Sequence, residues 1–179
     1  MFIGIKNFFR ERMLRKHESD IQTGMLPLSE IKTANVLMDI ENPDYDVLKE
    51  KVLAWFRNNN IKGEIWYIDF RKLDKNTLLL TSIQTTIIKK ELNWFGAPSL
   101  EKLNNLLENK TDLFISLTDK TYFVNILMSK CSKARFKIGR IPLDHKTYDM
   151  VFKTEADSLL GNSAMQVFTE ITAFLKKVN

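Results

Sequence analysis

The segment Asn35-Val36-Leu37-Met38-Asp39-Ile40 begins the part of the sequence that is most informative about the fold. It is a short, nearly continuous apolar run, which is typical of a strand covered on both faces. A helical pattern follows this segment. Its apolar residues recur with a period of 3.6 residues, at Tyr45, Leu48, Val52, Trp55 and Phe56. A second β-rich run follows, Glu64-Ile65-Trp66-Tyr67-Ile68-Asp69-Phe70. This order and spacing predict a βαβ unit with a right-handed crossover.

The same alternation continues toward the C-terminus. Strand-like runs occur at 83–90, 112–117, 136–141 and 148–153, and helical patterns separate most of them. We therefore predict an α/β fold with a doubly wound, mainly parallel sheet of about five or six strands, Rossmann-like or flavodoxin-like. We expect residues 34–179 to form a single α/β domain, preceded by a basic N-terminal helical extension and linker over residues 1–33.

Capping residues mark the expected helix starts. Asn42 can act as an N-cap, with Pro43 at the first helical position. Ser99 precedes a leucine-rich helical pattern as a second N-cap. Thr118 or Asp119 can cap the helix that follows the strand at 112–117.

The formal charge of +5 is concentrated at the N-terminus. Residues 1–16 carry five basic side chains and one acidic side chain, whereas the remaining residues carry 22 basic and 21 acidic side chains. A nearly neutral body gives little support to an electrostatic nucleic-acid interface, so we expect no nucleic-acid partner.

The basic N-terminal segment has two interpretations. On a helix, its apolar residues would form a stripe flanked by lysine and arginine, as in helices that lie on anionic membrane surfaces. The same helix could instead pack on its own domain or on a partner. The sequence has no run of 18 or more apolar residues, so we expect no transmembrane helix. Lys6, Arg10 and Arg12 interrupt the apolar stretch that a secretory signal needs. We therefore expect a cytoplasmic protein, with peripheral membrane contact through residues 1–16 as an alternative role for this segment.

The sequence contains no catalytic motif. Cys131 is the single cysteine, which excludes an internal disulfide and a thiolate metal cluster. No glycine-rich turn follows the first strand, no G-x-S-x-G elbow precedes a helix, and neither His17 nor His145 has a ligand-spaced partner. The sequence therefore predicts neither a bound metal nor a cofactor, and it leaves open whether the protein is an enzyme.

Charged residues follow several of the predicted strands. Ligands of open α/β sheets bind beyond the carboxyl ends of the strands. This chain places Asp39, Asp69, Arg71, Asp119 and Arg140 there. Carboxylates at such an edge could hold Mg²⁺ or form a phosphoacceptor site, but acidic residues at strand ends are also ordinary caps and turn formers. These five residues are therefore a candidate ligand-binding site, with backbone capping as the alternative.

Two aromatic residues lie on the connector Glu91-Leu92-Asn93-Trp94-Phe95-Gly96-Ala97-Pro98-Ser99. Large apolar rings on a surface connector either fold back onto the core or contact a partner. Trp94 and Phe95 are therefore candidate interaction residues, and Gly96 would let the backbone turn closely beneath them. The alternative is that both rings plug one end of the sheet.

Four segments of the chain together resemble a known family. They are Glu91-Leu92-Asn93-Trp94-Phe95-Gly96, Asp112-Leu113-Phe114-Ile115-Ser116-Leu117, Ala134-Arg135-Phe136-Lys137-Ile138-Gly139 and Tyr148-Asp149. From Asn35 onward the chain resembles a family of short uncharacterised bacterial α/β proteins that carry a Leu-Asn-Trp-Phe-Gly segment. Glu91 and Ser116 stand where that pattern has Asp and Asn. The resemblance implies a fold and no activity.

Two functions of different classes follow from these patterns. We expect a non-catalytic protein-interaction or binding module that uses the Trp94-Phe95-Gly96 connector to meet a protein partner or a second copy of the chain. The alternative is a small-molecule-binding enzyme or sensor with an acidic site at the carboxyl edge of the sheet.

Overall fold

The computed structural model describes residues 2–72, 81–143, 146–152 and 163–178. The helices are α1 (Phe2–His17), α2 (Tyr45–Asn58), α3 (Leu100–Glu108), α4 (Phe123–Cys131) and α5 (Ala164–Leu175), with short 3₁₀ turns at Leu28–Glu30 and Lys89–Glu91. The strands are β1 (Thr33–Asp39), β2 (Lys62–Asp69), β3 (Thr86–Ile88), β4 (Thr111–Ser116), β5 (Ala134–Gly139) and β6 (Met150–Val151).

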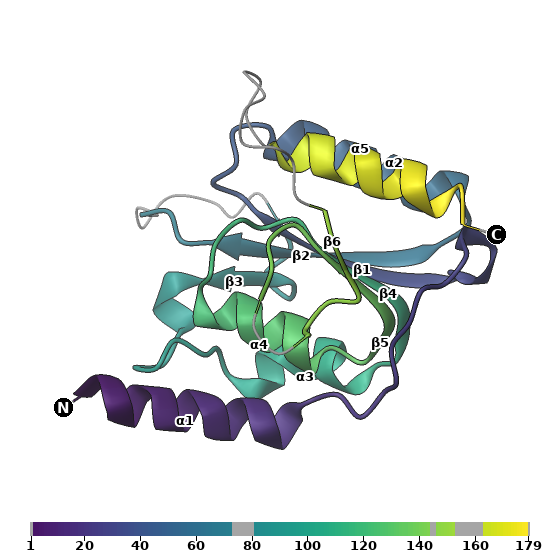
Figure 1. The fold of residues 1–179 in the computed structure, drawn as a ribbon. Coiled ribbons are helices and arrows are strands. Elements are labelled where there is room, and N and C mark those ends of the chain that lie inside the picture. The colour runs from purple at the N-terminus through teal and green to yellow at the C-terminus, as the bar shows by residue number, and fades with distance from the viewer. Residues whose placement is uncertain (1, 73–80, 144–145, 153–162, 179) are drawn as a thin grey trace.

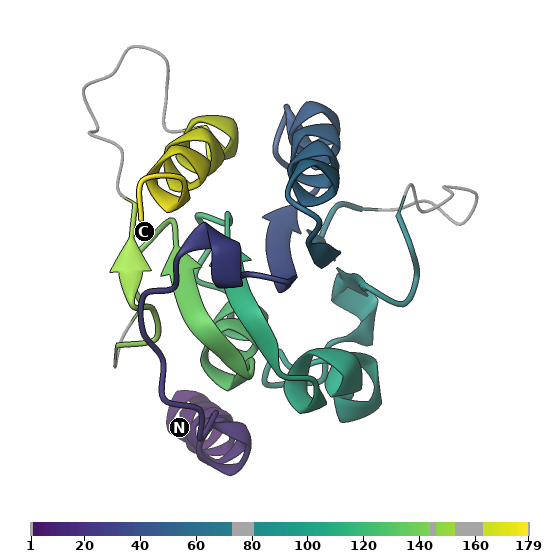
Figure 2. The same cartoon turned by 90° about the vertical axis from the view of Figure 1, so that its right-hand side faces the viewer.

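The strands form one parallel sheet in the order β3-β2-β1-β4-β5-β6 (Figures 1 and 2). The chain builds outward from β1 to one edge, then crosses back to place β4 on the other side of β1. In the register, Val36 of β1 lies opposite Ile65 of β2 and Ile115 of β4. The prediction of a doubly wound, parallel α/β fold is therefore confirmed, and the strand order is the Rossmann order.

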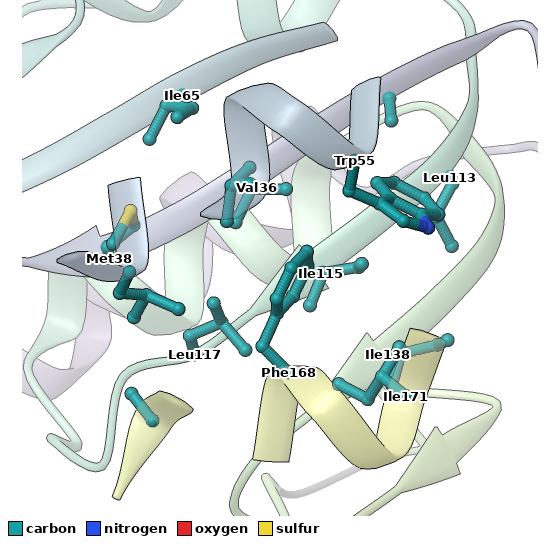
Figure 3. Packing of buried hydrophobic residues seen from close by; sticks show 14 of the residues in the cluster. Val36, Met38, Trp55, Ile65, Leu113, Ile115, Leu117, Ile138, Phe168 and Ile171 are labelled. Carbon is teal, nitrogen blue, oxygen red and sulfur yellow. The ribbon is translucent and has the colours of Figure 1, made fainter. Parts of the chain in front are cut away.

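Helices cover both faces of this sheet. On one face, α2 and α5 enclose a core in which Trp55 and Phe168 pack over Val36, Met38 and Ile115 (Figure 3). A second core lies between the opposite face and helices α3 and α4. Successive strand residues alternate between the two cores, so both faces of the sheet are apolar and buried. This explains the unbroken apolar runs in the sequence.

Helix α1 forms an additional layer outside α3 and α4 (Figures 1 and 2). It packs on α4, where Met13 and Leu14 contact the second core and the Cys131 thiol lies 3.9 Å from the Leu14 carbonyl oxygen. Burial raises the pKa of the Cys131 thiol to about 12, so this buried cysteine is a poor nucleophile. In the described part of the chain, none of the helices has the length and apolar character that crossing a membrane requires.

Two polar side chains of the C-terminal half, those of Asp112 and Lys137, connect elements of the fold. The Asp112 carboxylate accepts hydrogen bonds of 2.9 Å from the backbone N–H groups of Lys32 and Thr33, which ties the starts of β1 and β4 together. The ammonium group of Lys137 donates to the carbonyl oxygens of Ser129 and Lys130 and thereby caps the C-terminus of α4. Burial lowers the pKa of Lys137 to about 8.

Three local predictions need correction. Helix α2 begins at Tyr45 with Asp44 as N-cap, because Asn42 makes a turn in which its side chain accepts from the Asp44 N–H. The N-cap of α4 is Tyr122, because the Thr118 hydroxyl is engaged elsewhere. The strand expected at 83–90 is limited to Thr86–Ile88 by a turn before it and the 3₁₀ turn after it. The prediction for Ser99 is confirmed, since its side chain accepts from the Lys102 N–H.

Candidate functional site

The carboxyl edge of the sheet has its topological switch point between β1 and β4. There the winding of the chain reverses its direction. The connection after β1 leads to one face of the sheet, and the connection after β4 leads to the other. Parallel α/β sheets bind ligands in the crevice that this reversal creates. Asp39 ends β1 and Thr118 lies two residues beyond β4, so both stand at this point of the sheet.

A hydrogen-bond network joins Asp39 to α4. The Thr118 hydroxyl donates a short hydrogen bond to the Asp39 carboxylate, and it accepts from the Asn125 side-chain amide at 3.0 Å and from the Lys120 N–H at 3.1 Å. The amide of Asn125 also donates to the Lys120 carbonyl at 2.8 Å. Among the described residues, the side-chain oxygen of Asn125 is buried and has no hydrogen-bond partner. The network thus leaves one buried acceptor that a ligand donor or water could satisfy.

The Asp39 carboxyl has a perturbed pKa. Burial raises its pKa to about 6, the Thr118 hydrogen bond opposes this rise, and the nearby charge of Asp119 adds to it. Its protonation state therefore changes close to neutral pH. Carboxyl groups with a pKa raised by burial are frequent at functional sites, and structural hydrogen-bond networks also contain them.

Asp119 and Arg140 lie beside this network. A carboxylate oxygen of Asp119 lies 3.6 Å from the Arg140 guanidinium and the other lies 3.5 Å from the Lys120 ammonium group. The guanidinium also donates to the Leu117 carbonyl at 3.2 Å. Three of the five predicted edge residues, Asp39, Asp119 and Arg140, are therefore gathered around Thr118 and Lys120.

The other two predicted edge residues pair with each other at the end of β2. The Arg71 guanidinium donates two hydrogen bonds of 2.8 and 2.9 Å to the two carboxylate oxygens of Asp69. These hydrogen bonds to the Asp69 carboxylate raise the pKa of Arg71. Both oxygens of this buried carboxylate are thus used within the protein. In the described ranges, no three histidine, cysteine or acidic side chains come together in a way that could hold a metal ion.

Asn125 is a member of the network that sequence reasoning missed. Its sequence neighbours Phe123, Val124, Leu127 and Met128 are all buried apolar residues of α4. An asparagine within such a stripe is a detectable signal, because a buried amide needs hydrogen-bond partners.

The connector between β3 and α3 is a rigid turn. The Asn93 side chain accepts hydrogen bonds of 3.1 Å from the N–H groups of Phe95 and Ala97, and its own N–H donates to the Ala97 carbonyl at 2.8 Å. Gly96 adopts a φ of 90°, a conformation that other residues rarely take. This turn directs the two aromatic rings differently: Phe95 packs against the second core, whereas the Trp94 side chain is 57% exposed.

Helix α1 packs against the connector. The Phe9 ring contacts Trp94 edge-on at 5.3 Å and stacks on Phe95 at 6.1 Å between ring centroids. The Arg10 guanidinium donates to the Phe95 carbonyl at 2.7 Å and lies over the Phe123 ring, 4.9 Å from its centroid. These contacts fix α1 on the α/β body through a charge-assisted hydrogen bond and a cation–π contact.

Sequence comparison identifies the family. Residues 6–176 match a family of unknown function, DUF6913, and the chain belongs to this family. No curated protein and no solved structure matches the chain. The family description assigns no activity.

Proposed function

We propose that this protein is a non-catalytic docking module whose contact surface is formed by α1 and the connector. We call this surface the docking face; it consists of Ile5, Phe8, Phe9 and Trp94. The observation that carries the proposal is the exposure of these large apolar side chains, which ranges from 40% for Phe9 to 60% for Phe8. A soluble monomer rarely exposes an apolar patch of this kind without an interaction that uses it.

The members of the docking face are neighbours in space. Ile5 lies one helical turn before Phe8 and Phe9 on α1. The Phe8 and Phe9 rings contact each other at 5.7 Å, and Phe9 contacts Trp94. Because Arg10 holds α1 against the Phe95 carbonyl, these side chains are presented on a fixed support. A preorganised surface loses little conformational entropy on binding, which favours affinity.

Trp94→Ala tests this function. The protein is immobilised through its C-terminus and exposed to a whole-cell extract that includes membranes, and the bound protein, lipid and nucleic acid are each quantified. We expect the captured material to fall about ten-fold or more, since exposed aromatic anchors carry much of the binding energy of an interface. The melting temperature should change by less than about 2 °C, because the ring is mostly outside the core.

Val47→Ala is the matched control for this experiment. Val47 is 65% exposed on α2, on the opposite side of the sheet, so its removal should leave capture unchanged. Equal capture by the wild type and Trp94→Ala would exclude the docking function. A loss of stability of several kcal/mol in Trp94→Ala would instead identify the ring as a core residue.

The Asp39–Thr118–Asn125 network supports a second candidate function, the binding of a small polar molecule at the switch point. The unpartnered side-chain oxygen of Asn125 and the ionisable Asp39 favour a ligand that donates hydrogen bonds, such as a hydroxy acid, an amino acid or a polyol.

A thermal-shift panel of these three classes tests the second candidate. A ligand at about 100 times its Kd stabilises the folded protein by about 2.7 kcal/mol, which raises the melting temperature by several degrees. We expect at least one compound to do so with the wild type and not with Asp39→Ala. If no compound shifts the wild type, or the variant responds equally, the switch point is not a site for such ligands.

A further inference from the structure

We infer that the docking face binds the protein to an anionic membrane surface, with α1 lying in the plane of the membrane. This inference rests on the proposed docking function and names its partner. It depends on the basic side chains that accompany the exposed apolar residues on the same helix, and on the outer position of α1 in the fold (Figure 1).

The outward side of α1 combines the two chemistries. One row of the helix contains Ile5, Phe8, Arg12, Arg15 and Lys16 at spacings of three and four residues, and all five side chains are exposed. The apolar residues stand in the N-terminal half of the row and the basic residues in the C-terminal half. The opposite side of the helix carries Arg10, Met13 and Leu14, which contact the body.

Helices that bind at the membrane interface present the same two kinds of side chain. Such helices insert aromatic and aliphatic side chains between the headgroups, and their lysine and arginine side chains attract anionic lipids. Trp94 extends the apolar part of the face from the connector, and tryptophan favours the headgroup region. Glu11 is the single acidic residue among residues 1–16 and pairs with Arg15 at 3.5 Å, so the segment keeps a net charge of +4.

The same charges argue against two other occupants. A second copy docked through this face would bring two helices of charge +4 together, and like charges across an interface oppose association. A protein partner would need an acidic groove to complement this charge. An anionic lipid surface is complementary in both its charge and its apolar interior.

Vesicle sedimentation tests the inference. The full chain is mixed with phosphatidylcholine vesicles that contain roughly one-third phosphatidylglycerol, and with pure phosphatidylcholine vesicles as the neutral reference. We expect binding to the anionic vesicles only, and its loss when salt rises from about 0.1 to about 0.5 M, because salt screens the attraction. Phe8→Ser should weaken binding about ten-fold or more, since it removes an inserted ring.

The double variant Arg12→Glu/Arg15→Glu separates charge from apolar contact. Each basic residue near an anionic surface raises the partition coefficient about five-fold, so this variant should bind at least about 25-fold more weakly. Lys176→Glu/Lys177→Glu makes the same change of charge at exposed positions after α5 and should bind like the wild type. All four residues are exposed, so both variants should keep the melting temperature of the wild type.

Tryptophan fluorescence reports the contact directly. The chain has three tryptophans, of which Trp55 and Trp66 are buried and Trp94 is exposed. Anionic vesicles should therefore shift the emission to shorter wavelength, and Trp94→Phe should remove this shift while the protein still sediments.

Three results would overturn the inference: no sedimentation of the wild type with anionic vesicles, equal sedimentation with neutral vesicles, or undiminished binding by Arg12→Glu/Arg15→Glu. The docking function would survive any of them if Trp94→Ala still lost capture of a protein from the extract. If Trp94→Ala captured as much as the wild type, the docking function itself would be wrong.

Discussion

Phe168→Ala should lower the free energy of unfolding by about 3–5 kcal/mol, as large-to-small changes of buried aromatic residues do. Phe168 of α5 is fully buried and contacts the Trp55 ring of α2 edge-on at 5.9 Å (Figure 3). It therefore joins the two helices that cover this face of the sheet. Alanine would leave a cavity beneath both helices, and the surrounding side chains would lose dispersion contacts that water cannot replace.

Chemical denaturation followed by circular dichroism measures this effect. Val47→Ala changes an exposed apolar residue on the neighbouring helix α2 and should alter stability by less than about 0.5 kcal/mol. An equally small effect of Phe168→Ala would show that α5 does not share the core with α2.

Asp39→Asn should stabilise the protein by up to about 3 kcal/mol at neutral pH. Burial raises the pKa of Asp39 to about 6 in the folded state, whereas the unfolded value is about 4. The folded protein therefore holds this proton more tightly than the unfolded chain does. The stability that protonation contributes is fully present below about pH 4 and is lost as the pH rises through 6. Asparagine is neutral at every pH and avoids this loss.

Unfolding free energies at several pH values between about 4 and 8 test this profile. The difference between Asp39→Asn and the wild type should be near zero at about pH 4 and reach its maximum above about pH 7. Asp112→Asn is the contrasting control. Burial tends to raise the pKa of Asp112, but hydrogen bonds from Lys32 and Thr33 outweigh it and lower the pKa. Its replacement should destabilise the protein near neutral pH, and the loss should shrink in acid. A pH-independent effect of Asp39→Asn would contradict the raised pKa.

The raised pKa of Asp39 bears on function. An ionised Asp39 opposes folding at neutral pH, whereas the same position could carry a neutral residue without that cost. Stability is thus given up at the switch point of the sheet, which is where α/β proteins of this order bind ligands.

The kinds of elements could be predicted from the sequence because the central strands β1 and β4 are largely buried on both faces. Val36 and Leu37 are adjacent in β1, yet Val36 enters the core under α2 and α5 and Leu37 enters the core above α3 and α4. Both therefore had to be apolar, and the apolar run marked the strand. The Ser99 cap was also predictable, since its bond to the Lys102 N–H is local.

The carboxyl edge was predictable only in part. Parallel strands end at the same edge, so charged residues after the strands had to share it. Their partners follow from packing: the Arg71 guanidinium closes on Asp69, and the Thr118 hydroxyl bridges Asp39 to Asn125 of α4. Asn125 lies among apolar residues of α4 in the sequence, but the sequence does not show which groups its amide contacts.

Three features can be read from the amino-acid sequence: the alternation of strands and helices, the concentration of basic charge in residues 1–16, and the two aromatic rings on the connector. Three others depend on tertiary contacts: the order of the strands, the position of α1 outside α4, and the division of the rings into an inward Phe95 and an outward Trp94. The reason is that periodicity reports which side of an element is apolar and not which surface covers it. That surface is chosen by contacts between distant residues, such as the bond from Arg10 to Phe95 across 85 positions of the chain.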